Sequence, residues 1–368
     1  MPPKGPSSKL DLVAVARHII DYEPVGQQTF LAQGAVPGAE LPLPWTVAKP
    51  VPKPQPTPPK PDSPLPKVDY VIVTWTAAEV KALADVLTPG HPREEWYPYA
   101  RDFKRYLPAI RKDAPARKVR RLGSYFVTAI QGKKVLCFKS ELHLNQDGVP
   151  RLGQLPTLPV ADLFRQLLQE TRPTLIITAG TAGATFGKTK LGDVMLTRAA
   201  RFRLNDEFKT APFNNQTYAC TWMPKIPVGF FAKAKPLLDA HKDKLSTNSL
   251  VTRTPWLWVE GHKTAGRFDF KAFAPILTTD FFEYGTTTNH LDRIGCGVEM
   301  GDAVLGMVVD ALPQKPRWLV IRNASDPQID GTLPKKEQVK AAVEAYQQYG
   351  YWTSVNSSIA AWAVIAAD

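Results

Sequence analysis

Beyond residue 67 the apolar residues follow two spacings, and these alternate along the chain. Runs rich in β-branched and aromatic residues predict buried strands at 68–75, 125–130, 133–140, 174–180, 191–197 and 317–322. Apolar residues at helical spacing predict helices at 77–87, 158–170, 299–312, 335–348 and 354–367. Gln131 and Gly132 join two of the strands, which predicts a hairpin. The alternation indicates an α/β domain whose mixed sheet is covered by helices on both faces.

The part of the chain before residue 68 has a different pattern. Residues 41–67 contain 11 prolines in 27 positions. Because proline fixes φ and has no backbone N–H, this run is neither a helix nor an inner strand, and we expect an extended, polyproline-like linker. A docking peptide for an aromatic-lined groove is the alternative. Residues 1–40 hold one expected short helix at 10–20, so the predicted organisation is 1–40, a proline-rich linker at 41–67, and a main domain at 68–368.

Composition and charge narrow the class of protein. The 368 residues are 44% hydrophobic and 22% charged, which excludes a wholly disordered or fibrous chain. No apolar run is long enough to cross a bilayer, and the start of the chain lacks a signal-peptide pattern, so we expect a cytoplasmic protein without a membrane partner. Three widely spaced cysteines, Cys137, Cys220 and Cys296, predict reduced thiols and no metal site.

The formal charge of +12 favours a phosphate-bearing partner, which could be a nucleotide, nucleic acid or an anionic surface. Residues 91–121 carry ten Lys and Arg against four acidic residues. Arginine binds phosphate oxygens in pairs, so this basic insert is consistent with a nucleotide substrate. A solvated insertion or a nonspecific nucleic-acid patch would explain the charge equally well, although we do not expect nucleic acid to be the partner.

Candidate chemistry lies where predicted strands end or helices begin, because open α/β sheets bind ligands beyond the carboxyl ends of their strands. The segments are 76–80, 180–187, 297–302 and 321–330. Residues 180–187 follow a strand and are expected to form a glycine-rich turn whose backbone N–H groups could hold an anion. A phosphate-binding P-loop is disfavoured, because Ala182 stands where its first glycine should be and Lys188 leads into a strand.

Five ordered motifs together are more specific than any one of them. They read VIVTWTAAEVKAL, ITAGTAGATFGKTKLGDVML, TTDFFEYG, GVEMGDAVLGMVV and VIRNASDPQID. In this order they resemble the nucleoside phosphorylase and nucleosidase superfamily, most closely its hydrolytic methylthioadenosine/adenosylhomocysteine and AMP nucleosidases. The resemblance implies a phosphorylase-like α/β/α sandwich with a central mixed sheet that assembles as a homo-oligomer. It also implies hydrolysis of the N-glycosidic bond of a purine nucleoside or nucleotide, with adenine favoured and AMP or ATP included, as in antiphage effectors.

The resemblance also implies residue roles that suit this chemistry, which needs an acid at the base and negative charge near the sugar. Asp326 matches the general acid that protonates purine N7, and Glu79 matches the carboxylate that orients and deprotonates the attacking water. The implied substrate-binding residues are Thr181, Gly183, Phe282, Glu299, Met300, Arg322 and Ser325. No cofactor and no metal are implied.

Each residue also has an ordinary structural interpretation. Asp326 could form an Asx turn before Pro327, and Glu79 could be a solvated charge on a helix. Phe282 could belong to the core, and Arg322 could form a surface ion pair. The order of the motifs, rather than any single position, favours the functional interpretation.

Two departures from the family pattern affect the expected reaction and the expected binding of the sugar. Phosphorolytic relatives hold phosphate with arginines at places occupied here by Thr76, Ala77 and Ala179, which favours hydrolysis over phosphorolysis. The ribose-binding helix of the family reads V-E-M-E, whereas this chain has Gly301 at the second glutamate. Either Glu299 or Asp302 substitutes, or the sugar is held differently, or the chain is a catalytically silent nucleotide-binding module.

Overall fold

The computed structural model describes residues 41–368 apart from 145–146, 223–227, 246–256, 260–261, 264–273 and 327. The helix expected at 10–20 lies outside these residues. The described strands are β1 (Val51–Pro52), β2 (Tyr70–Thr74), β3 (Tyr97–Tyr99), β4 (Gly123–Ile130), β5 (Lys133–Ser140), β6 (Leu175–Ala184), β7 (Val194–Thr197), β8 (Ala199–Phe202), β9 (Thr217–Ala219), β10 (Leu257–Val259), β11 (His262–Lys263), β12 (Ile276–Thr278), β13 (Gly297–Glu299) and β14 (Arg317–Asp326).

The described helices are α2 (Ala77–Leu87), α3 (Phe103–Tyr106), α4 (Pro115–Val119), α5 (Pro159–Thr171), α6 (Val228–Asp239), α7 (Asp302–Asp310) and α8 (Lys335–Ala367). Short 3₁₀ turns lie at η2 (Arg93–Glu95), η3 (Leu107–Ala109), η4 (Lys242–Leu245) and η6 (Leu291–Arg293). In the described part of the chain, we find no helix with the length and hydropathy needed to span a membrane.

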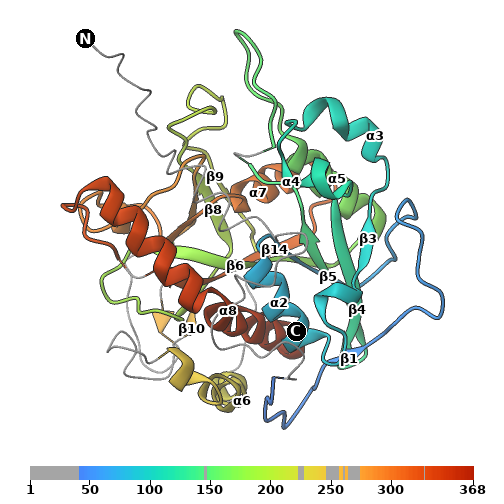
Figure 1. The fold of residues 1–368 in the computed structure, drawn as a ribbon. Coiled ribbons are helices and arrows are strands. Elements are labelled where there is room, and N and C mark those ends of the chain that lie inside the picture. Colours follow the sequence, from blue (N-terminus) through green and yellow to red (C-terminus); the bar gives the residue numbers. More distant parts are fainter. Residues whose placement is uncertain are drawn as a thin grey trace, which may run out of the picture.

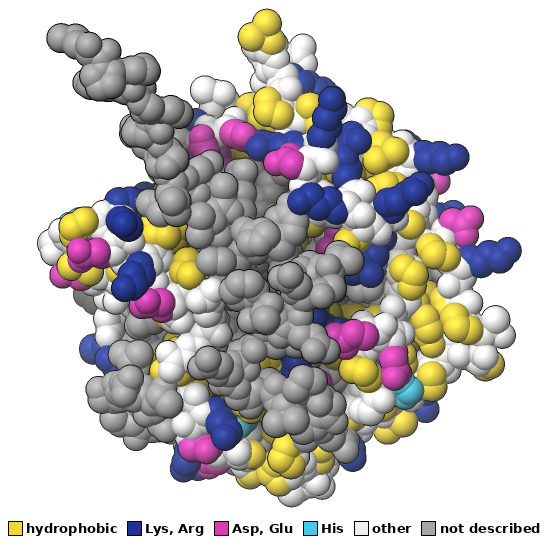
Figure 2. All heavy atoms as spheres, viewed as in Figure 1, with side chains coloured by type: hydrophobic (Ala, Val, Ile, Leu, Met, Phe, Trp, Pro, Cys, Tyr) yellow, Lys and Arg dark blue, Asp and Glu magenta, His cyan; other side chains and the backbone are white. Residues whose placement is uncertain are grey.

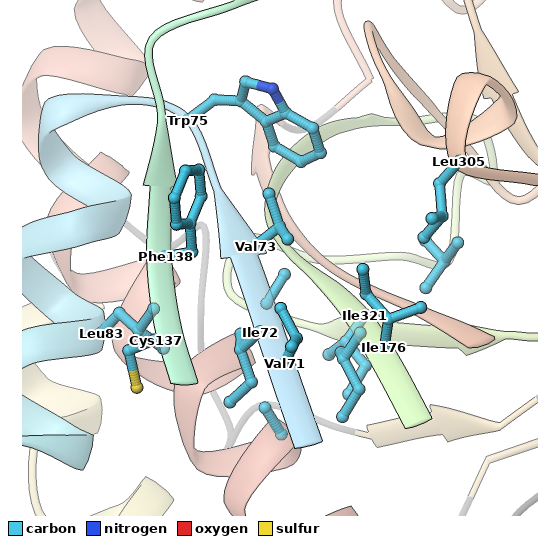
Figure 3. Close-up of a cluster of buried hydrophobic side chains, with 14 of the residues drawn as sticks. Val71, Ile72, Val73, Trp75, Leu83, Cys137, Phe138, Ile176, Leu305 and Ile321 are labelled. Atoms are coloured by element: carbon cyan, nitrogen blue, oxygen red, sulfur yellow. The ribbon is translucent and has the colours of Figure 1, made fainter. Parts of the chain in front are cut away.

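The strands form one mixed sheet, as the sequence predicted (Figure 1). β2 is parallel to β5 and β6, and β6 is parallel to β14. The predicted hairpin is β4 and β5, which are antiparallel and are joined at Gln131 and Gly132, both with positive φ. α8 packs against α2 and α6, while α5 packs against α7. Figure 3 shows Leu83 of α2 at one side of the central strands and Leu305 of α7 at the other, so helices cover both faces.

The core lies between these layers. Val71 and Ile72 of β2, Cys137 of β5 and Ile176 of β6 have no exposed surface (Figure 3). Val71 and Ile72 are successive residues, so their side chains point to opposite faces of β2. Because both are buried, both faces of this strand are covered. This explains why its sequence is a continuous apolar run rather than an alternating one. Because β2 and β6 are held in place by this core, the ends of these strands have fixed positions relative to one another.

Several predicted boundaries were wrong; among the strands, β7 begins at Val194 rather than at 191, and β14 continues to Asp326 rather than ending at 322. The helices expected at 335–348 and 354–367 are one helix, α8, which continues through Gly350, where a Cβ would lie 3.3 Å from the ring of Tyr346. The glycine-rich turn expected at 180–187 is strand as far as Ala184, because residues 183 and 184 pair with β13. The helix expected from residue 299 begins at Asp302, since Glu299 is the last residue of β13.

The proline-rich segment is extended and lies against the main domain rather than away from it. Its short strand β1 pairs antiparallel with β4 at the edge of the sheet. The rings of Trp45 and Trp362 meet edge to face with centroids 5.0 Å apart, and Trp362 Nε1 donates to the carbonyl of Ala48 at 2.8 Å. Leu65 N donates to the Glu170 carboxylate at 2.7 Å. The division of the chain at residues 40 and 67 stays a prediction.

Candidate active site

A cavity of about 120 Å³ lies beside the ends of β2, β6 and β14. This is the edge of the sheet at which the parallel strands finish, as expected for an open α/β fold. The sequence singled out nine site residues from five separate stretches of chain, and the structure places all of them around this cavity. They are Glu79, Thr181, Gly183, Phe282, Glu299, Met300, Arg322, Ser325 and Asp326.

Glu79 is buried and holds two strand ends together. Thr76 caps α2 and forms a reciprocal capping box with Glu79: Glu79 N donates to Thr76 Oγ1, and Thr76 N donates to Glu79 Oε2 at 2.9 Å. The same oxygen accepts from Thr74 Oγ1 and Trp75 N, each at 2.9 Å. Oε1 accepts from both N and Oγ1 of Thr181 at 2.7 Å. A solvated charge is therefore excluded.

The pKa of Glu79 is lowered in spite of its burial. Burial raises the pKa, but the charge of Arg322 and the donors at Thr181 and Thr76 outweigh it. Gly180 makes this arrangement possible, because a Cβ at that position would lie 2.4 Å from Glu79 Oε1 and 2.8 Å from Arg322 Nη1. A glycine within β6 thus lets the carboxylate approach the backbone of Thr181.

Arg322 is the centre of a buried ionic cluster rather than part of a surface ion pair. Its Nε and Nη2 bind the two carboxylate oxygens of Asp302 at 2.9 and 2.5 Å. Nη2 also donates to Glu299 Oε2 at 3.1 Å, and Nη1 lies 3.9 Å from Glu79 Oε1. The guanidinium carbon lies 4.9 Å from the ring centroid of Trp75. Three carboxyl groups therefore share one guanidinium beside the cavity.

Glu299 sits at the N-terminus of α7 and has its oxygens occupied. Oε1 accepts from Asp302 N at 2.9 Å and from Thr278 Oγ1, while Oε2 accepts from Gly301 N at 2.6 Å and from Arg322. A carboxylate offers about four lone-pair sites, so this carboxylate has little capacity left for a ligand in the structure as it stands. Burial and the neighbouring Asp302 carboxylate raise the pKa of Glu299 to about 8.

Asp326 differs from these acids because it has few partners. It is the last residue of β14, lines the cavity and is partly exposed there. Its Oδ1 accepts from Ser325 Oγ at 3.2 Å. Burial raises the pKa of Asp326 to about 7, and the single Ser325 hydroxyl offsets this only in part. At neutral pH this carboxyl group can therefore carry and release a proton.

An aromatic wall closes another side of the cavity. Phe281, Phe282 and Tyr284 line it, and the rings of Phe282 and Tyr284 lie nearly parallel, 14° apart in orientation with centroids at 5.6 Å. Phe282 also packs against the apolar cluster of Tyr284 and Ile329, so it belongs to both the core and the site. Glu283 between them pairs with Arg203 and accepts from Asn289 Nδ2 at 3.0 Å.

Several lining residues were not singled out from the sequence, among them Trp75, His143, Tyr284 and Tyr346. The Trp75 ring occupies the space beside Gly301, where a Cβ would lie 3.0 Å from its Cζ2. Tyr346 of α8 donates its hydroxyl to Thr76 Oγ1 at 2.6 Å. Burial lowers the pKa of His143 to about 4, so its ring is neutral at pH 7. Tyr284 and Trp75 lay inside quoted motifs, but nothing in the sequence singled out His143 or Tyr346.

The basic insert at 91–121 does not supply a lining residue among the described parts of the chain. Figure 2 shows dark-blue side chains over the region where Figure 1 labels α3. Arg111 pairs with Glu207, and Arg121 Nη2 lies 2.7 Å from Glu141. Arg117 donates to the backbone carbonyl of Ile110 at 2.7 Å. Arg111 and Arg121 thus hold the insert to the body, whereas Arg117 connects two parts of the insert. Within the described residues, no cluster of His, Cys, Asp or Glu could hold a metal ion.

No protein-family model matches the chain, and no curated protein matches it. Solved structures do match. A 5'-methylthioadenosine/S-adenosylhomocysteine nucleosidase from Neisseria meningitidis, in complex with methylthio-immucillin-A, is 14% identical, with a TM-score of 0.44 over 81% of this chain and 99% of the other. A Helicobacter pylori nucleosidase of the same name is 11% identical, with a TM-score of 0.43 over 79% and 95%.

The futalosine hydrolase of Helicobacter pylori is 12% identical, with a TM-score of 0.43 over 80% of this chain and 98% of the other. Identities of this size do not transfer residue roles, so the function is inferred from the side chains of the cavity.

Proposed function

We propose that the protein hydrolyses the N-glycosidic bond of a purine nucleoside. The observation that carries the proposal is the pairing, in one cavity, of an acid that titrates near neutral pH with a buried group of carboxyls. Asp326 supplies the acid, and Glu79 and Asp302 supply negative charge around Arg322, while the Glu299 carboxyl, whose pKa is raised to about 8, completes the group. Cleavage of such a bond needs a protonated leaving base and a stabilised sugar cation, and this site offers both.

The proposed reaction begins at the base and ends at the sugar. The Asp326 carboxyl donates its proton to purine N7, the C1'–N9 bond breaks, and its electron pair goes to the base. The sugar carbon that is left electron-poor lies among the carboxyls of the ionic cluster. Water adds to C1', and its proton passes to the Asp326 carboxylate or to solvent. Phe282 provides the flat surface on which the base stacks.

Glu79 has the role of holding the attacking water. Its lowered pKa keeps it ionised, so it attracts the water more than it accepts a proton. In the structure the hydroxyl of Thr181 donates to Oε1 at 2.7 Å. A hydroxyl can rotate, and when it turns away a water molecule can take its place on the carboxylate.

The test is release of free base, measured by chromatography. Wild-type protein is incubated with adenosine, inosine, methylthioadenosine, AMP and ATP, and Asp326→Asn serves as the matched variant. We expect free purine from a nucleoside and a loss of at least about 100-fold with the variant, since general acids contribute roughly that much or more. Folded protein that releases no base from any of these substrates would overturn the proposal.

The lining favours a nucleoside over a nucleotide. Among the described residues it holds the carboxyls of Glu79, Glu283, Glu299 and Asp326, and the guanidinium of Arg322 is already bound by carboxylates. A phosphate group would meet the ionised Glu79 carboxylate there and, among the described lining residues, no Lys or Arg other than Arg322, which disfavours its binding. We therefore expect adenosine to be cleaved more efficiently than AMP. A cationic side chain supplied by another copy of the chain would reverse this order, and the substrate comparison detects it.

A second candidate function is binding without turnover, and one observation favours it. The oxygens of Glu79 and Glu299 are occupied by donors from the protein itself. In such a module, calorimetry would show tight binding of an adenine nucleoside or nucleotide while chromatography shows no free base. Turnover that Asp326→Asn removes would exclude it.

A further inference from the structure

The carboxyl groups around the cavity are already engaged. Among the described lining residues these groups belong to Glu79, Glu283, Glu299 and Asp326. Both oxygens of Glu79 and of Glu299 accept hydrogen bonds from the protein, and those of Glu283 are bound by a guanidinium and an amide. Asp302 has no exposed surface, and both of its oxygens bind the guanidinium of the ionic cluster. Apart from Asp326, which the proposed function assigns to the base, these carboxyls hold the protein together.

Trp75 lines the cavity beside the ionic cluster and directly follows β2 (Figure 3). The guanidinium carbon of Arg322 lies 4.9 Å from its ring centroid, and a Cβ at Gly301 would lie 3.0 Å from its Cζ2. The indole N–H, the one polar group of this side chain, donates to the Leu142 carbonyl at 3.0 Å. The ring also meets that of Phe164 edge to face, with centroids 6.3 Å apart. Trp75 therefore offers only carbon to a ligand.

We infer that the substrate needs no 2'-hydroxyl, so that the protein binds and cleaves 2'-deoxynucleosides at least as well as ribonucleosides. This assignment rests on the proposed function, which places the sugar at the ionic cluster. A 2'-hydroxyl there meets the carbon of Trp75 and carboxyls whose oxygens are occupied, such as those of Glu299. A site with a free hydrogen-bond partner rejects a ligand that lacks the hydroxyl by roughly 10⁴-fold or more, whereas an apolar wall does not.

The first test compares adenosine with 2'-deoxyadenosine. We expect the kcat/KM of the wild type, measured from the free adenine released, to be at least as high for 2'-deoxyadenosine. Because the 2'-hydroxyl also changes the reactivity of the glycosidic bond, the dissociation constants are measured as well, by calorimetry with Asp326→Asn. Adenosine should bind less than about fivefold more tightly than 2'-deoxyadenosine, and a larger preference, the size of a neutral hydrogen bond, overturns the inference.

A variant of Glu299 tests whether its carboxyl binds the sugar. In the Asp326→Asn background, Glu299→Gln removes the acid but keeps the size of the side chain. If Glu299 held the sugar hydroxyls, the variant would weaken the binding of adenosine more than that of 2'-deoxyadenosine. We expect the ratio of the two dissociation constants to change less than about twofold, because the oxygens of Glu299 bind the protein instead. A larger change in this ratio contradicts the inference.

The same measurements separate the inference from the proposed function. If the wild type binds both nucleosides with similar affinity but releases no adenine, the proposed function fails and the inference stands. If it cleaves both but binds adenosine more than about fivefold more tightly, the proposed function stands and the inference fails. If folded protein binds neither nucleoside, both are overturned.

Discussion

Asp326 and Glu79 are both carboxylic acids in the wall of one cavity, and their pKa values move in opposite directions. The cause is the number of donors each one meets. Glu79 accepts from backbone N–H groups and hydroxyls on both oxygens and lies beside Arg322, whereas Asp326 meets only the Ser325 hydroxyl. Two acids with separated pKa values can serve as proton donor and fixed anion in the same site.

The pH dependence of cleavage follows from this difference. Asp326 acts as an acid only while it is protonated, and its pKa is raised to about 7. We expect kcat/KM to be constant between about pH 5 and 6 and to fall tenfold per pH unit above about pH 7. The profile is measured with the best nucleoside substrate. An acid limb in place of this alkaline limb would contradict the role of Asp326.

The stability of Asp326→Asn provides an independent check. In the unfolded chain this carboxyl has a pKa near 4, and folding raises it to about 7, so the wild type loses stability as pH rises through this window. Asparagine does not titrate. We therefore expect the Tm of the variant, relative to wild type, to increase between about pH 4 and pH 7 and to level off above it, as measured by calorimetry.

Among the residues of the ionic cluster, replacement of Arg322 should lower the free energy of unfolding most. Without it, Glu79, Glu299 and Asp302 would be buried together with no positive charge. We expect Arg322→Met to lower the free energy of unfolding by about 3–5 kcal/mol at pH 7, measured in urea. The control is Arg317→Met, which breaks a more exposed pair with Asp368 and should cost less than about 1 kcal/mol. Similar losses for the two variants would contradict this view of the cluster.

Much of the site was predictable at this scale because its residues lie in ordered motifs. The sequence did not predict that the carboxylate oxygens of Glu79 and Glu299 are already occupied by hydrogen-bond donors, because several of these donors are backbone N–H groups. His143 and Tyr346 were also beyond prediction, because each reaches the cavity through a segment whose pattern is either polar loop or ordinary helix. Only the folded chain brings these distant positions to one wall.

At the level of elements, the start of α2 connects helix stability to the site. Thr76 caps the helix, accepts from Glu79 N and from Tyr346, and ties α8 to α2. We expect Thr76→Ala to lower the free energy of unfolding by about 1–2 kcal/mol, the usual cost of a lost cap. Thr76→Ser keeps the hydroxyl and should cost much less. Urea unfolding of both variants decides this, and an equal loss for alanine and serine would show that the cap is not responsible.

The elements themselves were predicted well where burial alone determines them. Strands buried on both faces, such as β2 and β5, gave apolar runs that fixed their positions within two residues. The ends of β6 and α8 were misplaced because glycine was taken as a break. A Cβ at Gly350 would lie 3.3 Å from the Tyr346 ring, and Gly180 of β6 leaves room for Glu79, because a Cβ there would lie 2.4 Å from Oε1. Close approach, rather than chain reversal, explains these glycines.

On the scale of the whole molecule, the segment at 41–67 acts as a strap across the main domain. Trp45, Val47 and Ala48 pack against the core, and Trp362 near the end of α8 binds the Ala48 carbonyl. These contacts join the beginning of the described chain to its last helix, the same helix that brings Tyr346 to the cavity. The proline composition predicted the extended form but not this attachment.

The strap can be tested by truncation. A chain that starts at residue 41 keeps every contact of the strap, whereas one that starts at residue 49 loses the Trp45 ring, Val47 and the hydrogen bond from Trp362. We expect the free energy of unfolding of the shorter chain to be roughly 2–4 kcal/mol lower than that of the longer one, because the shorter chain loses buried apolar area and the ring contact. Because the two chains differ by eight residues far from the ionic cluster, pKa effects should cancel between them. Equal stability of the two chains would show that the strap rests on the domain without stabilising it.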